Sequence, residues 1–200
     1  MWKKIIINLL MAVLLGMCSL QGIAAAGQAS LQKGIASGVI RFHVLADSDA
    51  KEAQQVKLQV KDRIVSYLDP LLRDADSAEE CRSRIRSHLR VIEEKSRQTL
   101  EEQGVSCAVS AGLKRAWFPE KTYGDCTFPA GFYEALQIRI GSASGRNWWC
   151  VLYPGLCFEN SLKGVVTDEG KEKLARVLTE EEMACVMDQG KVKIRFRWFS

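Results

Sequence analysis

The sequence predicts a single α+β domain in which a mainly antiparallel sheet carries two long helices packed on one face. Strand signals, in which β-branched or aromatic residues alternate with polar ones, occur around Val39, Val105, Phe132, Trp148 and Lys191. Two longer segments, one ending near Pro70 and one opening at Ser77, place their apolar residues on a helical stripe. Since each strand and helix then offers one apolar face, a two-layer arrangement buries both sets.

The chain begins with the pattern of a secretory signal. Lys3 and Lys4 precede an apolar run over 5–20, and Ala24-x-Ala26 supplies the small residues of a cleavage site. The apolar run also approaches the length of about 20 residues that spans a bilayer, so an uncleaved anchor formed by residues 5–26 is the alternative. We expect a signal peptide or N-terminal membrane anchor at 1–26, a linker at 27–38 and the exported domain at 39–200.

Charge and cysteine usage narrow the classes of function. The formal charge of +4 falls to +2 when residues 1–26 are removed, because they hold Lys3 and Lys4 and no acidic residue. Such a balance gives no basis for nucleic-acid binding. An oxidising space permits disulfides among Cys81, Cys107, Cys126, Cys150, Cys157 and Cys185. No two of these have C-x2-C spacing and the chain holds 2 histidines, so we expect no zinc and no other cofactor.

The first strand, VIRFHVLA over 39–46, leads into the first long helix. Asp49 and Glu52 have the spacing of a capping box, which predicts that the helix begins there. Its apolar stripe consists of Ala53, Val56, Val60, Ile64 and Tyr67 or Leu68. We expect it to end near Pro70, because proline removes a backbone donor.

The second long helix opens at a second capping box, Ser77-Ala78-Glu79-Glu80. Its apolar face is formed by Cys81, Ile85, Leu89, Ile92 and Leu100, and its other face carries Arg82, Arg84, Arg86 and Arg90. Two interpretations of this basic face are open. It is a solvated helix face, or it contacts an anionic membrane surface.

The rest of the chain alternates strands, loops and short helices. Strands are expected at 105–113 and 132–140, with loops marked by Pro119, Gly124 and 129–131 between them. Two short helices are expected at 168–178 and 179–187, the second opened by the box at Thr179. The last strand, 191–199, has an apolar face and a basic one formed by Lys193, Arg195 and Arg197.

The densest stretch is NWWCVLYPGLCF at 147–158. Trp148 and Trp149 are adjacent, so in a strand they point to opposite faces of the sheet. The sequence at 153–156 predicts a type II turn, with proline first and glycine second of its central residues. A hairpin would bring Cys150 and Cys157 near each other as a disulfide, although its diagonal geometry is close to the limit of an S–S bond. Core aromatics or a recognition surface are both consistent with this stretch.

These stretches together resemble the stage II sporulation protein R family of endospore-forming bacteria. The supporting sequences are IRFHVLADSD at 40–49, QVKLQVKDRI at 55–64, WFPEKTYGDCTFPAGFYEAL at 117–136 and GRNWWCVLYPGLCF at 145–158. Asp47, Tyr153 and Gly155 depart from the residues usual in the family, and the likeness is looser beyond Asn160.

The resemblance implies an exported, non-enzymatic signal that acts in the space between the two membranes of the sporulation septum. There it would promote the activity of a membrane-embedded aspartic protease, which matures the precursor of the mother cell's early sigma factor. One part of the candidate partner surface lies on the first strand and the residues directly after it, and the other part lies in the stretch 147–158. Its residues are Arg41, His43, Asp47, Asp49 and Asn147 with Trp148 or Trp149.

Two other classes of function were weighed against this one. A secreted hydrolase would use His43 with Asp47, Asp49 or Cys150, but the sequence shows no nucleophile elbow, HExxH or paired-carboxylate motif. A cell-wall glycan-binding module would use Trp117, Trp148 or Trp149 as stacking platforms.

Overall fold

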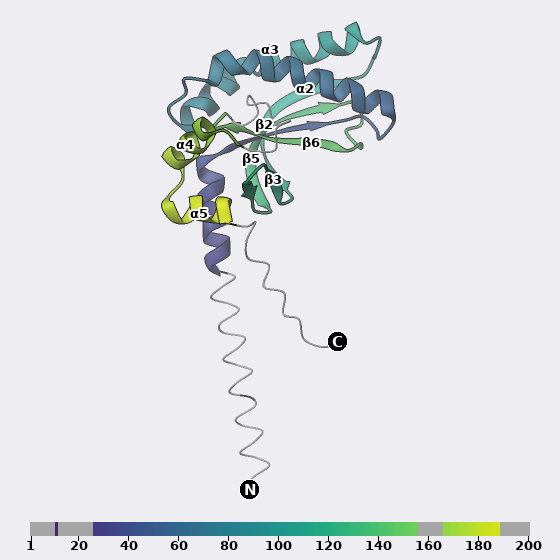
Figure 1. Ribbon diagram of the computed structural model, residues 1–200. Coiled ribbons are helices and arrows are strands. Elements are labelled where there is room, and N and C mark those ends of the chain that lie inside the picture. Colours follow the sequence, from purple (N-terminus) through teal and green to yellow (C-terminus); the bar gives the residue numbers. More distant parts are fainter. Residues whose placement is uncertain (1–10, 12–25, 156–165, 189–200) are drawn as a thin grey trace.

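The computed structural model describes residues 11, 26–155 and 166–188. A four-stranded sheet has the order β2-β5-β1-β6. Its strands are β1 (Ile40–Leu45), β2 (Val109–Phe118), β5 (Gly131–Ile140) and β6 (Asn147–Tyr153). Helices α2 (Lys51–Leu72) and α3 (Ala78–Glu102) lie along one face of this sheet, as Figure 1 shows. The predicted α+β class and the placement of the two long helices are therefore confirmed.

The sheet is mixed, which refines the prediction of a mainly antiparallel sheet. β1 pairs with β5 in parallel and with β6 in antiparallel orientation, and β2 pairs with β5 in antiparallel orientation. The parallel pair arises because the α2–α3 hairpin and β2 lie between β1 and β5 in the chain, and β5 then returns alongside β1. Alternation within each strand could not reveal which strands become neighbours.

The two long helices bury their stripes against the sheet, with α3 packed along β2 and β1 and α2 along β6 and β1. Fully buried contributors include Ile64 and Leu68 from α2 and Ile85 from α3, which meet Phe42 and Ile138 of the sheet. The prediction that α2 ends near Pro70 is confirmed, with Pro70 lying in the last turn of the helix. The helix continues to Leu72, which is 3% exposed. Burial of this last apolar side chain offsets the loss of one backbone hydrogen bond near the helix end.

The three capping boxes predicted from the sequence have different outcomes. Ser77 caps α3 by accepting a hydrogen bond from the backbone N–H of Glu80, at 3.2 Å. By contrast, α2 begins after Ala50 with no side-chain cap, so the predicted box of Asp49 and Glu52 does not form. Thr179 caps α5 (Glu180–Asp188) reciprocally with Glu182, at 3.3 and 2.9 Å, as its sequence predicts.

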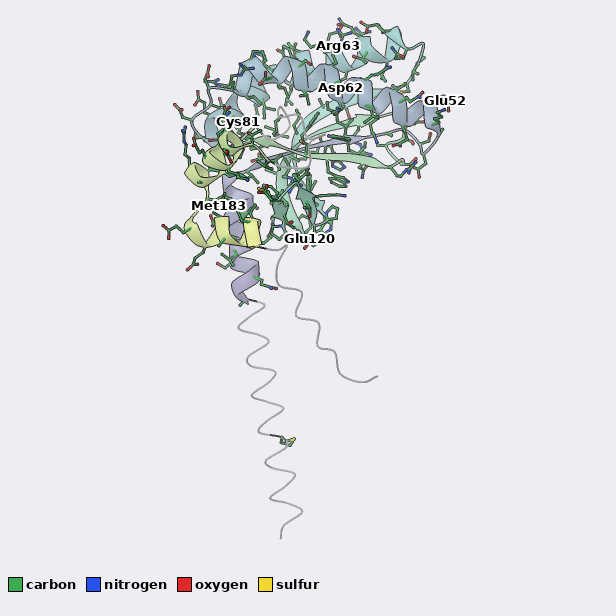
Figure 2. All side chains as sticks on the ribbon, viewed as in Figure 1. Glu52, Asp62, Arg63, Cys81, Glu120 and Met183 are labelled. Carbon is green, nitrogen blue, oxygen red and sulfur yellow. The ribbon has the colours of Figure 1, made fainter. Side chains whose placement is uncertain are left out.

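The second face of the sheet is covered at one end by short elements. These are the hairpin of β3 (Lys121–Tyr123) and β4 (Cys126–Phe128), α4 (Asp168–Val177), α5 and the helical residues 26–38 (Figure 1). Ile35 in the predicted linker at 27–38 is completely buried here, so these residues form part of the fold. Met183 lies beside this helix, and Glu120 lies at the exposed end of the hairpin (Figure 2).

Several predictions shift or fall outside the described residues. β2 starts at Val109 rather than Val105, and the segment assigned to loops contains the β3–β4 hairpin, with Gly124 at a φ of 59° in its turn. The strand predicted at 191–199 and all of the proposed signal except residues 11 and 26 lie outside the described part. Within the described part, no helix has the length and apolar character needed to cross a bilayer.

Candidate functional site

The predicted site is built around the middle strand β1. Arg41 and His43 lie on the face of the sheet away from α2 and α3, because side chains alternate along the strand and Phe42 enters the helix-covered core. His43 is opposite Trp149 on β6, and Leu45 is opposite Asn147. The structure thus brings Arg41, His43, Asn147 and Trp149 to one face.

Arg41 is completely buried in an aromatic cage. Its guanidinium carbon lies 4.5 Å from the ring centroid of Phe118 and 4.9 Å from that of Tyr133. The rings of Tyr123 and Phe128 complete the cage at 5.7 and 5.1 Å. Nε donates to the backbone carbonyl of Cys150 at 3.1 Å, and Nη2 donates to the hydroxyl of Tyr123 at 3.0 Å.

No carboxylate within the described residues forms an ion pair with Arg41. Burial lowers the pKa of its guanidinium, but arginine stays charged in proteins. The negative faces of the surrounding rings therefore stabilise the cation in place of a counter-ion. The sequence predicts Arg41 at a surface. In the structure its side chain instead stabilises the second core, which is the buried cluster on the face of the sheet away from α2 and α3.

His43 is 4% exposed and stacks on Trp149, with ring centroids 3.9 Å apart and planes 16° from parallel. Gln137 Nε2 lies 3.4 Å from its Nδ1 and can only donate, so the ring proton belongs on Nε2. Burial lowers the pKa of His43 to about 4, Asn147 acts in the opposite direction, and the charge of Arg139 lowers the pKa further. His43 is therefore neutral at pH 7.

Besides Nη1 of Arg41, two polar atoms of this cluster are buried without a hydrogen-bond partner in the described part of the chain. They are Nε2 of His43 and Oδ1 of Asn147. Both belong to the same face of the sheet, at the end where β1 runs into Asp47. A neutral, stacked imidazole in this setting can exchange a hydrogen bond but has no acidic group to orient it for proton transfer.

Asp47 and Asp49 organise the loop between β5 and β6 rather than the start of α2. The Oδ1 of Asp47 accepts a hydrogen bond from the backbone N–H of Ser142 at 2.7 Å, and its carbonyl accepts one from the hydroxyl of Ser144 at 2.7 Å. The Oδ1 of Asp49 accepts from the backbone N–H of Arg146 at 2.6 Å. The expected helix-capping role is replaced because loop donors lie within reach of both carboxylates.

The two tryptophans point to opposite faces, as their adjacency predicts. Trp148 contacts the helix-covered core, and the amine of Lys61 lies 4.7 Å above its ring. Trp149 contacts the second core. Both sheet faces are covered here, so neither tryptophan is the exposed platform that a glycan-binding module would use.

The turn after β6 also differs from the prediction. The backbone N–H of Gly155 donates to the carbonyl of Leu152 at 3.1 Å, and the Tyr153-Pro154 peptide is cis. The turn therefore starts one residue earlier than the predicted type II turn, with proline in its third position. Cys150 is buried on β6, whereas Cys157 lies outside the described residues, so their disulfide stays a prediction.

A hydrolase centre does not assemble from the residues considered for it. Cys150 pairs with Phe42 and belongs to the helix-covered core, whereas His43 faces the other side of the sheet. Asp47 and Asp49 are engaged with the 141–146 loop. Within the described residues, no group of three or more histidine, cysteine or acidic side chains could hold a metal ion.

Two pockets in the described part of the chain lie away from the predicted residues. A pocket of about 510 Å³ is lined by Asp69, Asp76, Tyr153, Glu169 and Arg176 among others. A second, of about 550 Å³, lies beside the turn after α3 and includes Cys107 in its lining. Neither pocket includes a residue of the predicted partner surface.

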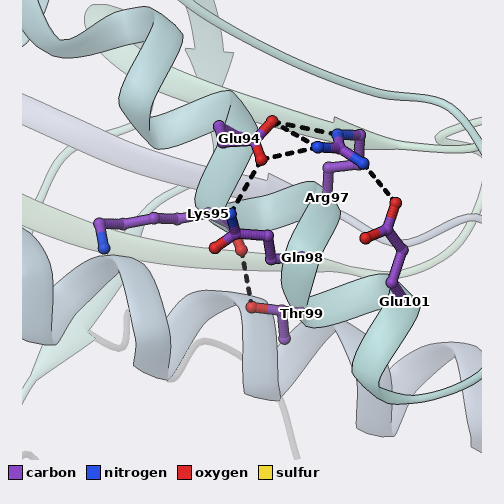
Figure 3. A network of polar contacts seen from close by, with 6 residues as sticks. All are labelled: Glu94, Lys95, Arg97, Gln98, Thr99 and Glu101. Atoms are coloured by element: carbon purple, nitrogen blue, oxygen red, sulfur yellow. Dashed lines mark hydrogen bonds and ion pairs between the residues drawn. The ribbon is translucent and has the colours of Figure 1, made fainter.

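The basic face of α3 is largely compensated by carboxylates. Arg82 contacts Glu134 of β5 at 2.6 Å and also pairs with Glu79, and Arg84 pairs with Glu80. Farther along the helix, Arg97 bridges Glu94 and Glu101, as Figure 3 shows. These contacts fit a solvated, internally paired helix face and leave Arg86 as a more exposed charge, with 60% of its side chain accessible.

Sequence reasoning missed one exposed feature. Trp117 and Phe132 are 55% and 50% exposed and contact each other edge to face across β2 and β5. Trp117 was considered as a glycan platform, but Phe132 was not singled out. The alternation of FYEALQI at 132–138 places Phe132 on the same face as Leu136, and only the strand pairing shows that it lies beyond the helix layer.

Comparisons with known proteins agree with one another. The family model described as "Stage II sporulation protein R (spore_II_R)" matches residues 36–163. Stage II sporulation protein R of Bacillus subtilis (strain 168) is 38% identical over 136 residues, which make up 68% of this chain and 61% of that protein. The chain therefore aligns with less than two thirds of this relative's length. No solved structure gives a significant match.

Proposed function

The chain belongs to the stage II sporulation protein R family, and from this premise we propose that it is an exported signalling protein of endospore formation. In this proposal it reaches the space between the septal membranes through its N-terminal segment. It there promotes the activity of a membrane-embedded aspartic protease. That protease matures the precursor of the mother cell's early sigma factor.

The observation that carries the proposal is the extent of the family match. Residues 36–163 include all four strands of the main sheet, both long helices and the β3–β4 hairpin. The relationship thus covers the whole main sheet and both long helices rather than a short motif. The structure adds that His43 is stacked and neutral and that Cys150 is on the opposite face, which favours a protein ligand over a hydrolase.

The predicted partner surface divides into buried and accessible members. Arg41, His43 and Trp149 support the second core from within. Asp47 and Asp49 hold the 141–146 loop, and Arg146 within it is 74% exposed. We therefore propose that the buried members act by shaping this end of the sheet, and that direct contacts to the partner come from the loop and Asp49.

Co-expression tests the proposal in a host that lacks other sporulation proteins. The full chain is produced with the candidate protease and its pro-protein substrate, and substrate cleavage is followed by immunoblot. We expect cleaved product when the chain is exported and none when residues 1–26 are deleted. Equal cleavage with and without the chain would contradict the proposal, and a His43→Gln variant that abolished a hydrolase activity of the purified protein would favour an enzyme instead.

A further inference from the structure

The exposed aromatic pair lies on the outer edge of the sheet. Trp117 is in β2, which is the end strand of the order β2-β5-β1-β6, and Phe132 is its direct neighbour in β5. Their ring centroids are 5.3 Å apart in an edge-to-face arrangement. A protein gains nothing for its own fold by leaving two large adjacent rings in water, and contiguous exposed apolar surface commonly marks an interaction site.

The backbone of β2 shows which groups face outward. The carbonyl of Ala108 accepts a hydrogen bond from the N–H of Gly141 at 2.7 Å. The backbone N–H and C=O groups of the even-numbered residues of β2 therefore point toward β5. The N–H of Ala111 donates instead to the carboxylate of Glu93 on α3, at 3.1 Å. Because hydrogen bonding alternates along an antiparallel pair, Leu113, Arg115 and Trp117 present their N–H and C=O groups to the outside.

The charge near Trp117 and Phe132 is positive, whereas the carboxylate of Glu93 lies farther along the edge at Ala111. The guanidinium of Arg115 lies 5.1 Å from the ring centroid of Phe132, and no carboxylate of the described residues pairs with it. Glu134 is opposite Arg115 in register, but Arg82 takes its short contact at 2.6 Å. Arg86 reaches Glu134 only at 3.8 Å with 60% of its side chain exposed. An acidic partner segment would complement this edge.

We propose that the β2 edge, defined by Leu113, Arg115, Trp117 and Phe132, docks an extended acidic segment of the protease partner as an added strand. This inference rests on the proposed function and adds a second contact surface, at the other end of β5 from the 141–146 loop. The partner's backbone would satisfy the outward N–H and C=O groups, with a carboxylate beside Arg115 and an apolar side chain against Trp117.

Two other roles for the β2 edge explain fewer of its structural features. Charged residues such as Arg115 protect sheet edges from aggregation, but that role does not call for an exposed tryptophan beside them. A membrane surface would suit arginine and aromatic side chains, but it would desolvate the outward backbone groups without supplying partners in register. An added strand uses the side chains and the backbone together.

The test distinguishes the contribution of the outward backbone groups to partner binding from that of the side chains. Arg115→Ala removes the charge and keeps the outward N–H, whereas Arg115→Pro also removes that N–H without touching the bonds to β5. Trp117→Ala removes the aromatic contact, and Arg63→Ala on α2 is the matched control for loss of an exposed arginine. Each full-length variant is co-expressed with the protease and substrate, and its folding is checked by thermal midpoint.

We expect Trp117→Ala and Arg115→Pro to lower precursor cleavage roughly tenfold, with Arg115→Ala intermediate and Arg63→Ala at the wild-type level. Hydrogen exchange on wild type should show the amides of Leu113, Arg115 and Trp117 slowed by addition of the purified protease. If Arg115→Pro fails to fold, Trp117→Ala and the exchange data decide.

Three results would overturn the inference. Wild-type cleavage by Trp117→Ala, without protection of the three amides, would remove the surface and leave the proposed function standing. Absence of cleavage with wild type would remove the proposed function and this inference together. Trp117-dependent binding to protein-free phosphatidylglycerol vesicles, or protection of the same amides by self-association, would assign the edge to a membrane or to a second copy.

Discussion

Two groups of aromatic side chains on β2 and β5 each contact an arginine and differ in burial. Phe118 and Tyr133 form part of the cage around Arg41, where the guanidinium is completely buried. Their chain neighbours Trp117 and Phe132 point to the other face, stay about half exposed and carry Arg115 on the Phe132 ring. A shift of one residue along each strand therefore separates a structural group from an accessible one.

The difference shows that residue types alone do not assign a role. A cation over aromatic rings contributes about 2 kcal/mol or more when desolvated and roughly 0.5–1 kcal/mol at an exposed site. We expect the buried group to determine stability and the exposed pair to have little effect on it. The exposed pair is then available for a partner.

The largest expected effect comes from removing one ring of the buried group. Phe118→Ala should lower the free energy of unfolding by about 3–5 kcal/mol, because it opens a cavity beside Arg41. Trp117→Ala should change it by less than about 1 kcal/mol, since the side chain is 55% exposed. Urea denaturation of both variants measures the contrast, and equal losses would show that the two groups do not differ as described.

The role of the buried charge is tested by two substitutions at one position. Arg41→Ala should cost about 3 kcal/mol, because it leaves a cavity and removes the donors to the Cys150 carbonyl and the Tyr123 hydroxyl. Arg41→Met keeps most of the volume and so avoids the cavity, but it removes the same donors and the contacts of the cation with the rings, so it should cost about 2 kcal/mol.

Arg115→Ala provides the exposed comparison for these two variants, and we expect a change within about 0.5 kcal/mol. All three free energies come from the same urea titrations. A methionine variant as unstable as the alanine variant would mean that the cation itself holds the cage.

The pH dependence of stability should reveal His43. Its pKa is about 4 in the folded protein, below the ordinary value of 6.5, so the unfolded chain binds the proton more readily between these values. The contribution is present in full above pH 6.5 and is lost as the pH falls toward 4. We expect a loss of about 3 kcal/mol at pH 4 relative to His43→Gln, because one pKa unit corresponds to about 1.4 kcal/mol and the folded imidazole is about half protonated at that pH.

Denaturation at pH 7 and pH 4 for wild type and His43→Gln isolates this contribution from that of the carboxylates. Parallel pH profiles of the two proteins would show that His43 is not held neutral on this face of the sheet.

A smaller effect than that of the buried group is expected at the loop. Asp47→Ala removes the acceptor for the backbone N–H of Ser142 and should cost about 1 kcal/mol. Asp62→Ala on the exposed surface of α2 is the matched control, with 67% of its side chain accessible. Hydrogen exchange should show faster exchange at Ser142 alone, whereas fraying at the start of α2 would restore the capping role for this region.

The layer of two long helices can be predicted from the sequence, because a helix with an aliphatic stripe is stable when that stripe packs against another apolar surface. The packing on the second face of the sheet cannot be predicted in this way. Arg41 and His43 are polar residue types, and their burial depends on aromatic rings from β2, β4, β5 and β6. Asp49 has a perfect capping-box spacing with Glu52, yet loop donors from residues 142–146 outcompete the helix N–H groups. Such long-range competition leaves no local trace in the chain.

The comparison of the two aromatic groups is tested most directly by measuring signalling per folded molecule. Arg41→Met and Trp117→Ala are co-expressed with the protease and its substrate, and cleavage is divided by the amount of folded exported protein. We expect near wild-type signalling for Arg41→Met and a roughly tenfold loss for Trp117→Ala. The opposite order, with Trp117→Ala active and Arg41→Met folded but silent, would contradict it.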